Sequence, residues 1–176
     1  MTNKKDLFEY FLSKLIEWHC VYHQIDMNDF NGHSTNDLSK LKLIKLHFFT
    51  CSTKDEALDF FDNFYAMPYG HVESSIYPTL DSLVNYRIES RGLTILNNVP
   101  NFAMIDQDKL NLMDESIAIL KSKNPDIISF SPFSLVELSH KWFSWSYTFE
   151  EARRENLYSK KISPEVIKKE TKFYCL

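Results

Sequence analysis

The chain has 176 residues, a length typical of one compact domain. Hydrophobic residues make up 44% and charged residues 25%, a balance that excludes an intrinsically disordered chain. The formal net charge of −4 disfavours broad attraction to phosphate backbones, so we do not expect a nucleic-acid partner. The three cysteines, Cys20, Cys51 and Cys175, are widely spaced and predict neither a disulfide framework nor a metal knuckle; they favour a cytoplasmic location.

No window approaches the roughly 18 apolar residues of a membrane-spanning helix, and the N-terminus lacks a signal-peptide pattern. We therefore expect no membrane partner. Helical periodicity and capping patterns predict helices over residues 6–22, 36–49, 54–64, 73–86, 106–123, 132–143, 150–156 and 164–174.

Capping patterns mark several of these helix starts. Thr53 and Glu56 form a capping-box pattern, as do the serine and glutamate at positions 134 and 137. Ser131 and Ser163 each precede a proline, which is favoured at a first helical position. Residues 36–49 are unusually apolar, so this helix is expected in the centre of the core.

Residues 66–78 (AMPYGHVESSIYP) interrupt the helical pattern. Pro68 fixes its own backbone angle and Gly70 can adopt a positive φ, so we predict a shaped corner between two helices. No nucleophile, metal set or paired carboxylate lies nearby in the sequence, which disfavours a catalytic loop.

The predicted fold is therefore mainly α: a single compact helical domain over residues 1–176 with about six to eight helices. A small β-hairpin or extended segment is expected near residues 92–105, because residues 92–98 (GLTILNN) favour β-structure and are too few for a helix.

A metal-dependent enzyme is one alternative considered for this chain. His19 and His23 lie four residues apart, the spacing that turns two imidazoles toward one helical face, and Cys20 is adjacent. His47 and Cys51 lie on another predicted helix. Ordinary packing is the favoured interpretation of all five residues, so we expect no metal, no cofactor and no catalytic residue.

Residues 142–147 (WFSWSY) form a dense aromatic segment that begins two residues after His140. Aromatic side chains in such numbers usually belong to the core, yet tryptophan and tyrosine at a helix end also anchor protein interfaces. Both interpretations stay open from the sequence alone.

Four segments, in order along the chain, resemble the Panacea domain, the SocA-like antitoxin domain found in phage-associated proteins. They are residues 40–49 (KLKLIKLHFF), 64–77 (FYAMPYGHVESSIY), 135–145 (LVELSHKWFSW) and 162–167 (ISPEVI). The resemblance covers about residues 38–174, after an N-terminal helix and loop over residues 1–35. The sequence departs from the family pattern at His71 and Ser144, where the family has proline, and at Ser139, where it has threonine.

The resemblance implies a cytoplasmic antitoxin that neutralises a cognate toxin by direct protein contact. The residues that it nominates for partner binding, together with the aromatic segment, are Tyr65, Met67, Tyr69, Gly70, His71, Tyr77, His140, Trp142 and Trp145. Two alternatives remain from the sequence: an adaptor that delivers a partner to a cellular protease, and a protein-binding role in a mobile element without a toxin.

Overall fold

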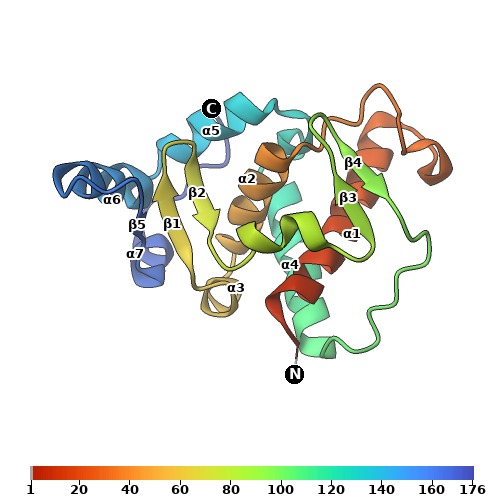
Figure 1. Cartoon of the computed structure of the whole chain (residues 1–176), viewed down its shortest axis with the longest axis horizontal. Helices are drawn as coiled ribbons and strands as arrows, with labels where there is room; N and C mark the ends of the chain where they lie inside the picture. Colours follow the sequence, from red (N-terminus) through yellow and green to blue (C-terminus); the bar gives the residue numbers. More distant parts are fainter. Residues whose placement is uncertain (1) are drawn as a thin grey trace.

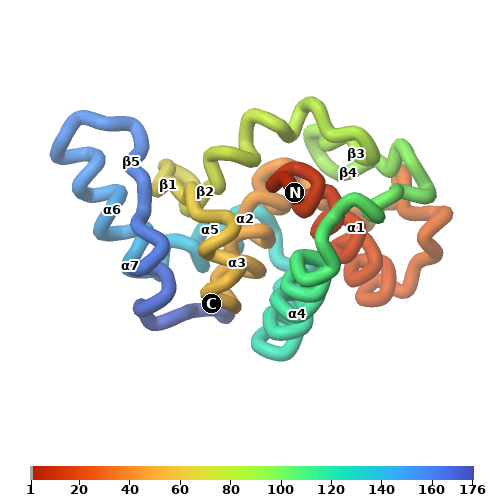
Figure 2. The backbone as a smooth tube through the Cα atoms, turned by 90° about the horizontal axis from the view of Figure 1, so that it is seen from below, coloured from red at the N-terminus to blue at the C-terminus, as the bar shows by residue number. Residues whose placement is uncertain are grey.

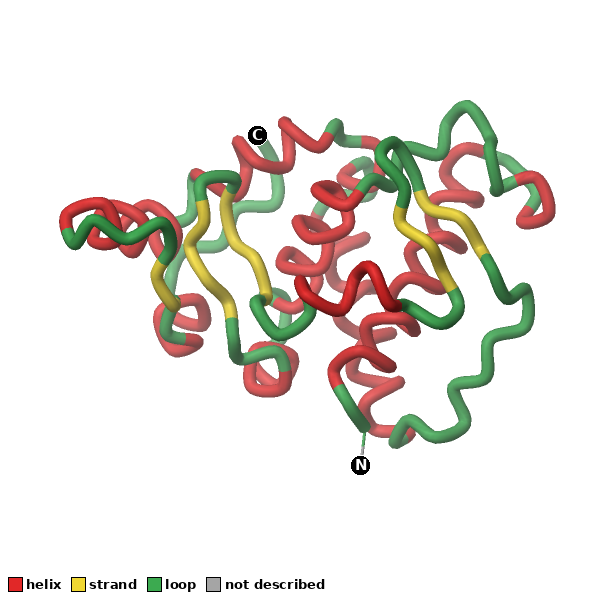
Figure 3. Tube along the Cα trace, viewed as in Figure 1, coloured by secondary structure: helices red, strands yellow, loops and turns green. Residues whose placement is uncertain are grey.

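The computed structural model describes residues 2–176, which hold seven α-helices, three short 3-10 helices and two small antiparallel sheets (Figures 1 and 3). The α-helices are α1 (Lys4–His23), α2 (Lys40–Cys51), α3 (Asp55–Phe60), α4 (Gln107–Lys123), α5 (Pro132–His140), α6 (Phe143–Arg154) and α7 (Pro164–Lys169). The 3-10 helices are Met27–Asp29, Tyr77–Ser82 and Ile127–Ser129. The strands are β1 (Phe64–Met67), β2 (Gly70–Glu73), β3 (Tyr86–Ile88), β4 (Leu93–Ile95) and β5 (Lys160–Lys161). Helices dominate, so the mainly α prediction holds in outline, with more β-structure than expected.

Helix α2 lies at the centre of the molecule, as its apolar sequence predicts. It contacts β2, α4 and α5, and its residues from position 42 to its end are all buried. Because apolar side chains leave this helix on nearly every side, it is stable only where other elements cover it all round. The helix begins at Lys40, later than predicted, and Ser39 makes no side-chain capping bond.

The stretch predicted as a corner between helices is instead a β-hairpin, so that prediction was wrong. Strands β1 and β2 pair antiparallel, with Met67 opposite Gly70 and Phe64 opposite Glu73, and Pro68 and Tyr69 form the connection. Strand β5 adds to the other edge of β1, giving the order β2-β1-β5. Strands of four residues are too short for their alternation to stand out in a sequence.

The segment after this hairpin holds less helix than predicted. Only the 3-10 helix Tyr77–Ser82 forms within residues 73–86, with Pro78 in its first turn. A second hairpin follows, in which Tyr86 of β3 lies opposite Ile95 of β4. The β-structure expected near residue 92 is therefore confirmed, although it ends at Ile95.

The aromatic segment after α5 begins a helix, which the sequence did not predict. Helix α5 starts as expected, because the Ser131 hydroxyl accepts a hydrogen bond from the Ser134 backbone N–H. Helix α6 then begins at Phe143 instead of residue 150. The capping box at Thr53 does not form, since its hydroxyl donates to the carbonyl of Thr50. Figures 1 and 2 agree in placing α6 and α1 at opposite ends of the molecule.

Among residues 2–176, no helix combines the length and apolar character that crossing a membrane requires.

Candidate protein-binding site

His71 on β2 points into the interior, where it joins three helices. Its ring stacks on Phe48 of α2, with centroids 3.6 Å apart and planes 7° from parallel. Nδ1 lies 2.7 Å from the hydroxyl of Ser139 on α5, and Nε2 lies 2.8 Å from the hydroxyl of Ser144 on α6. Burial lowers the pKa of His71 well below its usual value, so the imidazole is neutral. A neutral ring with one donor and one acceptor is fully satisfied by two hydroxyls.

Ser139 and Ser144 are therefore joined to each other through His71. His71 also donates its backbone N–H to the Ser139 hydroxyl at 3.1 Å, a bond that proline could not make. Ser144 supplies a hydroxyl where proline has none. His71, Ser139 and Ser144 thus form one hydrogen-bonded unit.

Lys45 on α2 lies beside this unit and is fully buried. Its ammonium donates to the carbonyl oxygen of His71 at 2.6 Å. Among residues 2–176, no carboxylate lies within ion-pair distance of this ammonium. Burial lowers the pKa of Lys45 to about 7, because desolvation disfavours the charged form. The molecule therefore keeps a basic group in its interior without an acid to compensate it.

Gly70 makes this arrangement sterically feasible. Its φ is +94°, which residues with a side chain rarely adopt. A Cβ at this position would lie 2.9 Å from Cβ of Ser139 and 3.1 Å from Nζ of Lys45, and closer still to the Ser139 hydroxyl. Glycine is therefore required where the hairpin meets α2 and α5.

A pocket of about 310 Å³ opens between α2 and the β1–β2 hairpin. Its lining residues are Lys40, Leu41, Ile44, Lys45, Met67, Pro68, Tyr69, Val72, Tyr77 and Tyr158. A second pocket of about 490 Å³ shares Lys40 and Leu41 with it and continues past β3 to Pro132 and Phe133. We call the two together the α2 groove. Its volume is within the range of ligand-binding pockets, and most of its lining is apolar.

Three tyrosines lie around the first pocket and are exposed. Tyr69 is 58% exposed, Tyr77 44% and Tyr158 74%. Lys40 makes a cation–π contact with Tyr77, its ammonium lying 4.7 Å from the ring centroid. Exposed tyrosines around an apolar depression are typical of protein-binding surfaces.

The predicted partner-binding residues divide into exposed and interior ones. Tyr69 and Tyr77 are exposed at the groove, and Met67, which lines it, is partly buried, as is Tyr65 on the same strand. Gly70, His71 and Trp142 are buried, so the expectation that they present contact surface needs correction: they support the hairpin from inside.

His140 and Trp145 are partly buried and stack on each other, with ring centroids 3.6 Å apart. Trp145 donates its indole N–H to the carbonyl of Met67 at 2.7 Å, which fixes the hairpin to α6. The stacked pair therefore fixes the turn end of the hairpin to α6. The sequence missed Lys45 and Tyr158, because only the fold brings them to the groove.

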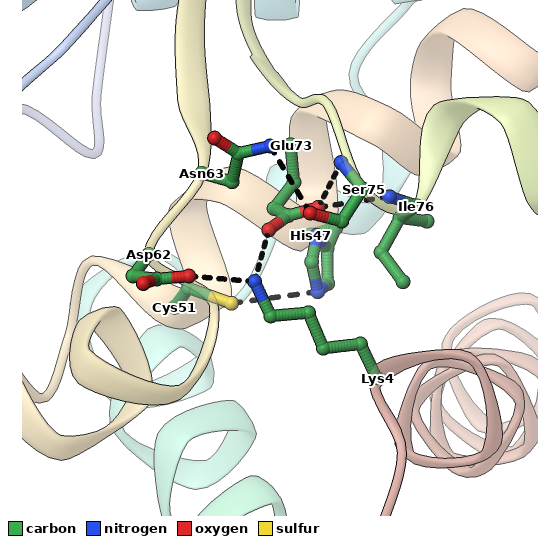
Figure 4. A network of polar contacts seen from close by, with 8 residues as sticks. All are labelled: Lys4, His47, Cys51, Asp62, Asn63, Glu73, Ser75 and Ile76. Atoms are coloured by element: carbon green, nitrogen blue, oxygen red, sulfur yellow. Dashed lines mark hydrogen bonds and ion pairs between the residues drawn. The ribbon is translucent and has the colours of Figure 1, made fainter.

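A polar network ties the other end of the hairpin to α1 (Figure 4). The Lys4 ammonium lies 2.8 Å from the buried carboxylate of Glu73 and 2.7 Å from the exposed carboxylate of Asp62. Glu73 also accepts hydrogen bonds from the backbone N–H groups of Ser75 and Ile76, both at 2.8 Å. Both carboxylate oxygens of Glu73 are thus bonded within the fold, which indicates a structural role.

His47 and Cys51 lie close together behind this network, with Nε2 3.5 Å from Sγ. Burial lowers the pKa of His47 to about 3 and raises the pKa of Cys51 well above its usual value. Both groups are therefore neutral, whereas a nucleophilic pair needs a thiolate and a base that accepts its proton. The geometry favours core packing for this pair.

The two histidines of the metal hypothesis also come together on α1. The rings of His19 and His23 have centroids 4.3 Å apart, and burial lowers the pKa of His19 to about 4. Within residues 2–176, no group of three histidine, cysteine or acidic side chains is arranged to hold a metal ion. His19 packs edge-on against the buried ring of Phe30, with centroids 5.7 Å apart.

No family model, curated protein or solved structure matches the chain. The α2 groove and the sequence segments that surround it are therefore the features that bear on function.

Proposed function

We propose that the protein is an antitoxin-like binding protein that neutralises a partner protein by direct contact through the α2 groove. The observation that carries this proposal is the set of exposed tyrosines, Tyr69, Tyr77 and Tyr158, around one apolar pocket. Rigid aromatic side chains contribute most of the affinity in many protein interfaces, because they bury a large area at a small cost in entropy.

The platform under these tyrosines is rigid, which favours binding over catalysis by a mobile loop. The hairpin is fixed to α6 through Trp145, to α2 through Lys45 and to α1 through Lys4. A preformed surface loses little conformational entropy when a partner binds, so its contacts contribute more fully to affinity.

The resemblance to the Panacea domain supplies the class of partner, a toxin. Two of the resembling segments, residues 40–49 and 64–77, contribute most of the first pocket's lining. The departures at His71, Ser139 and Ser144 lie in the interior beneath the hairpin, whereas Tyr69 and Tyr77 agree with the family pattern. A cytoplasmic site of action is part of this proposal and agrees with three free cysteines among the described residues.

Co-expression with the product of the adjacent open reading frame tests the proposal. We expect that product to arrest growth alone, growth to recover when this protein is present, and the two to co-purify. A harmless neighbour that does not co-purify would contradict the antitoxin function.

The half-life of the partner separates direct neutralisation from delivery to a protease. Direct neutralisation leaves the half-life unchanged or longer. A shortened half-life that depends on a cellular protease would replace our proposal with the adaptor function.

A further inference from the structure

We infer that the partner protein adds an extended segment to the outer edge of β3, where it pairs with the backbone of Ile88 and places an apolar side chain in the second pocket of the α2 groove. This inference deepens the proposed function and rests on it for the choice of surface. It adds the form of the partner: a β-strand that is recognised through its main chain.

The first argument is the direction of the backbone groups in β3. Glu89 donates its N–H to the carbonyl of Gly92 across the hairpin. At the other end of the hairpin, Leu96 donates to the carbonyl of Asn85. In an antiparallel ladder, such hydrogen-bonded pairs alternate with pairs whose N–H and C=O groups point away from the partner strand. The N–H and C=O of Ile88 therefore point to the outer edge, and neither has a hydrogen-bond partner among residues 2–176.

The other edges of the two sheets are protected by the protein itself. The Asn36 amide bonds to the C=O and N–H of Leu93, and the Asn31 amide bonds to those of Ile95, which closes the outer edge of β4. The outer edge of β2 is closed in the same manner by side chains of α2 and α5. Strand β5 is two residues long and both are lysines, which discourage further pairing. An unpaired edge attracts another strand, so the edge at Ile88 differs from the rest.

The second argument is the pocket beside this edge. Figure 1 shows β3 on the side of its hairpin that faces α2, and Ile88 lines the second pocket together with Leu41 of α2 and Phe133 of α5. The 3-10 helix Tyr77–Ser82 packs against β3 and Tyr86 is buried, so the edge is open only near Ile88. The ring of Phe133 is 66% exposed. A side chain from an added strand would therefore enter an apolar pocket of about 490 Å³.

The third argument comes from the opposite wall of the same pocket. Ser39, Lys40 and Leu41 line it at the start of α2, where Ser39 makes no side-chain capping bond. The N–H groups of Lys40 and Leu41 have no acceptor among the described residues, as is usual in the first turn of an uncapped helix. The pocket thus offers main-chain donors on both walls and apolar side chains between them. An extended polypeptide matches this pattern, because its carbonyl groups and side chains alternate in direction.

Hydrogen exchange of the backbone amides tests the inference on the full-length protein. In the free protein, the Ile88 amide should exchange rapidly, whereas the amides of Leu93 and Ile95 should be protected by their bonds to asparagine side chains. The probe is the peptide Ac-Lys-Thr-Val-Phe-Val-Thr-Lys-amide, whose central residues favour a β-strand. When it binds, we expect exchange of the Ile88 amide to slow at least about tenfold.

Two N-methylated forms of this peptide provide a matched control. One carries the methyl group on the phenylalanine nitrogen, and the other carries it on both valine nitrogens. Alternate N–H groups of a strand face the same neighbour, so one form should lose affinity at least about tenfold and the other should stay within about twofold of the parent peptide. The form that loses affinity also gives the direction of the added strand.

A variant of the protein removes the donor at the edge. Ile88→Pro eliminates the outward N–H without breaking a bond of the hairpin, and it should weaken peptide binding at least about tenfold. Ile88→Ala keeps the N–H and should bind the peptide more tightly than Ile88→Pro. A protected Ile88 amide in the free protein, equal binding of the two methylated peptides, or no binding of the parent peptide would overturn the inference, even if Ile88→Pro fails to fold.

The peptide results and the partner results fail independently. If the peptide binds as expected and the neighbouring gene product does not bind, the edge stands as a binding site and the antitoxin function falls. If the gene product binds and is neutralised while the Ile88 amide still exchanges rapidly, the function stands and the inference about β3 falls.

Discussion

The ammonium of Lys45 donates to the carbonyl oxygen of His71 at 2.6 Å, which joins the central helix α2 to the inner strand of the hairpin. The bond lies in a region that excludes water, because both residues are fully buried. A hydrogen bond to a charged donor contributes about 1.5–3 kcal/mol, less than the cost of desolvating an unpaired ammonium. The buried ammonium of Lys45 should therefore lower the free energy of unfolding of the protein.

Replacing Lys45 by methionine should stabilise the free protein. The pKa of Lys45 is about 7 in the folded chain against 10.5 for the free side chain, and each pKa unit corresponds to about 1.4 kcal/mol. After subtraction of the lost bond to His71, we expect the free energy of unfolding to rise by about 2 kcal/mol at pH 7. Urea unfolding of the two proteins measures the difference.

The advantage of Lys45→Met should also depend on pH. Between pH 7 and 10.5 the unfolded wild-type chain binds a proton at this position and the folded chain does not, so wild-type stability from this group rises with pH. Lys45→Met has no group that titrates at this position. Its excess in free energy of unfolding over the wild-type protein should therefore decrease by up to about 1.4 kcal/mol per pH unit. A difference that stays constant from pH 7 to 9.5 would show that Lys45 is not desolvated as described.

Substitution of Gly70 by alanine should destabilise the fold strongly. The new Cβ would lie 2.9 Å from Cβ of Ser139 and would require the positive φ of +94°. Overpacking of this kind typically costs about 1–3 kcal/mol, in addition to about 1 kcal/mol for the backbone. Gly32→Ala is the matched control, since Gly32 also has a positive φ but nothing lies within 4 Å of its Cβ position. Equal losses in the two variants would mean that contact with Ser139 has no part in the effect.

The sequence predicted the helices better than the hairpin, for reasons that lie in the residues. Helices α1 and α4 are long enough for apolar residues to repeat over several turns. Strand β1 has four residues and shows its alternation only through the half-buried Tyr65 and Met67. The burial of His71 was beyond prediction, because its partners Ser139 and Ser144 lie about seventy residues further along the chain. Such contacts follow from the packed fold and not from local pattern.

The buried histidines predict a loss of stability in acid. Burial lowers the pKa of His47 to about 3, so the unfolded chain takes up a proton below about pH 6.5 and the folded chain does not until far lower pH. Stability from this group is therefore present above pH 6.5 and falls as the pH is lowered. His47→Phe keeps a ring among Phe8, Phe11 and Phe61 and removes the titration.

Between pH 7 and pH 5, the free energy of unfolding of the wild-type protein should fall by about 2 kcal/mol more than that of His47→Phe. Thermal or urea unfolding at the two pH values provides the comparison. Parallel losses in both proteins would assign the acid sensitivity to other groups, such as His71 or the carboxylates.

The two carboxylates that bind Lys4 should differ in importance. Glu73 is buried and accepts two backbone N–H groups besides the ammonium, so Glu73→Gln should cost about 2 kcal/mol of stability. Asp62 is 56% exposed, and water can replace it, so Asp62→Asn should change stability by less than about 0.5 kcal/mol. A larger loss for Asp62→Asn than for Glu73→Gln would reverse the assignment of the structural partner.

The affinity of variants for the partner should show whether the partner binds at the α2 groove or at the exposed aromatic side chains of α6. Tyr69 is 58% exposed at the tip of the hairpin, and its side chain makes no hydrogen bond among the described residues, so Tyr69→Ala should leave the free energy of unfolding nearly unchanged. Tyr147 is 51% exposed and stacks on Phe143 of α6, away from the groove, which makes Tyr147→Ala a matched loss of one exposed ring.

If the partner binds at the groove, Tyr69→Ala should weaken its affinity at least about tenfold, because a central aromatic anchor typically contributes more than 1 kcal/mol. Tyr147→Ala should change the affinity less than about twofold. Titration calorimetry with the partner identified by co-expression measures both values. A larger loss of affinity for Tyr147→Ala than for Tyr69→Ala would place the binding surface on α6. The aromatic segment would then contact the partner, one of the two interpretations that the sequence allows.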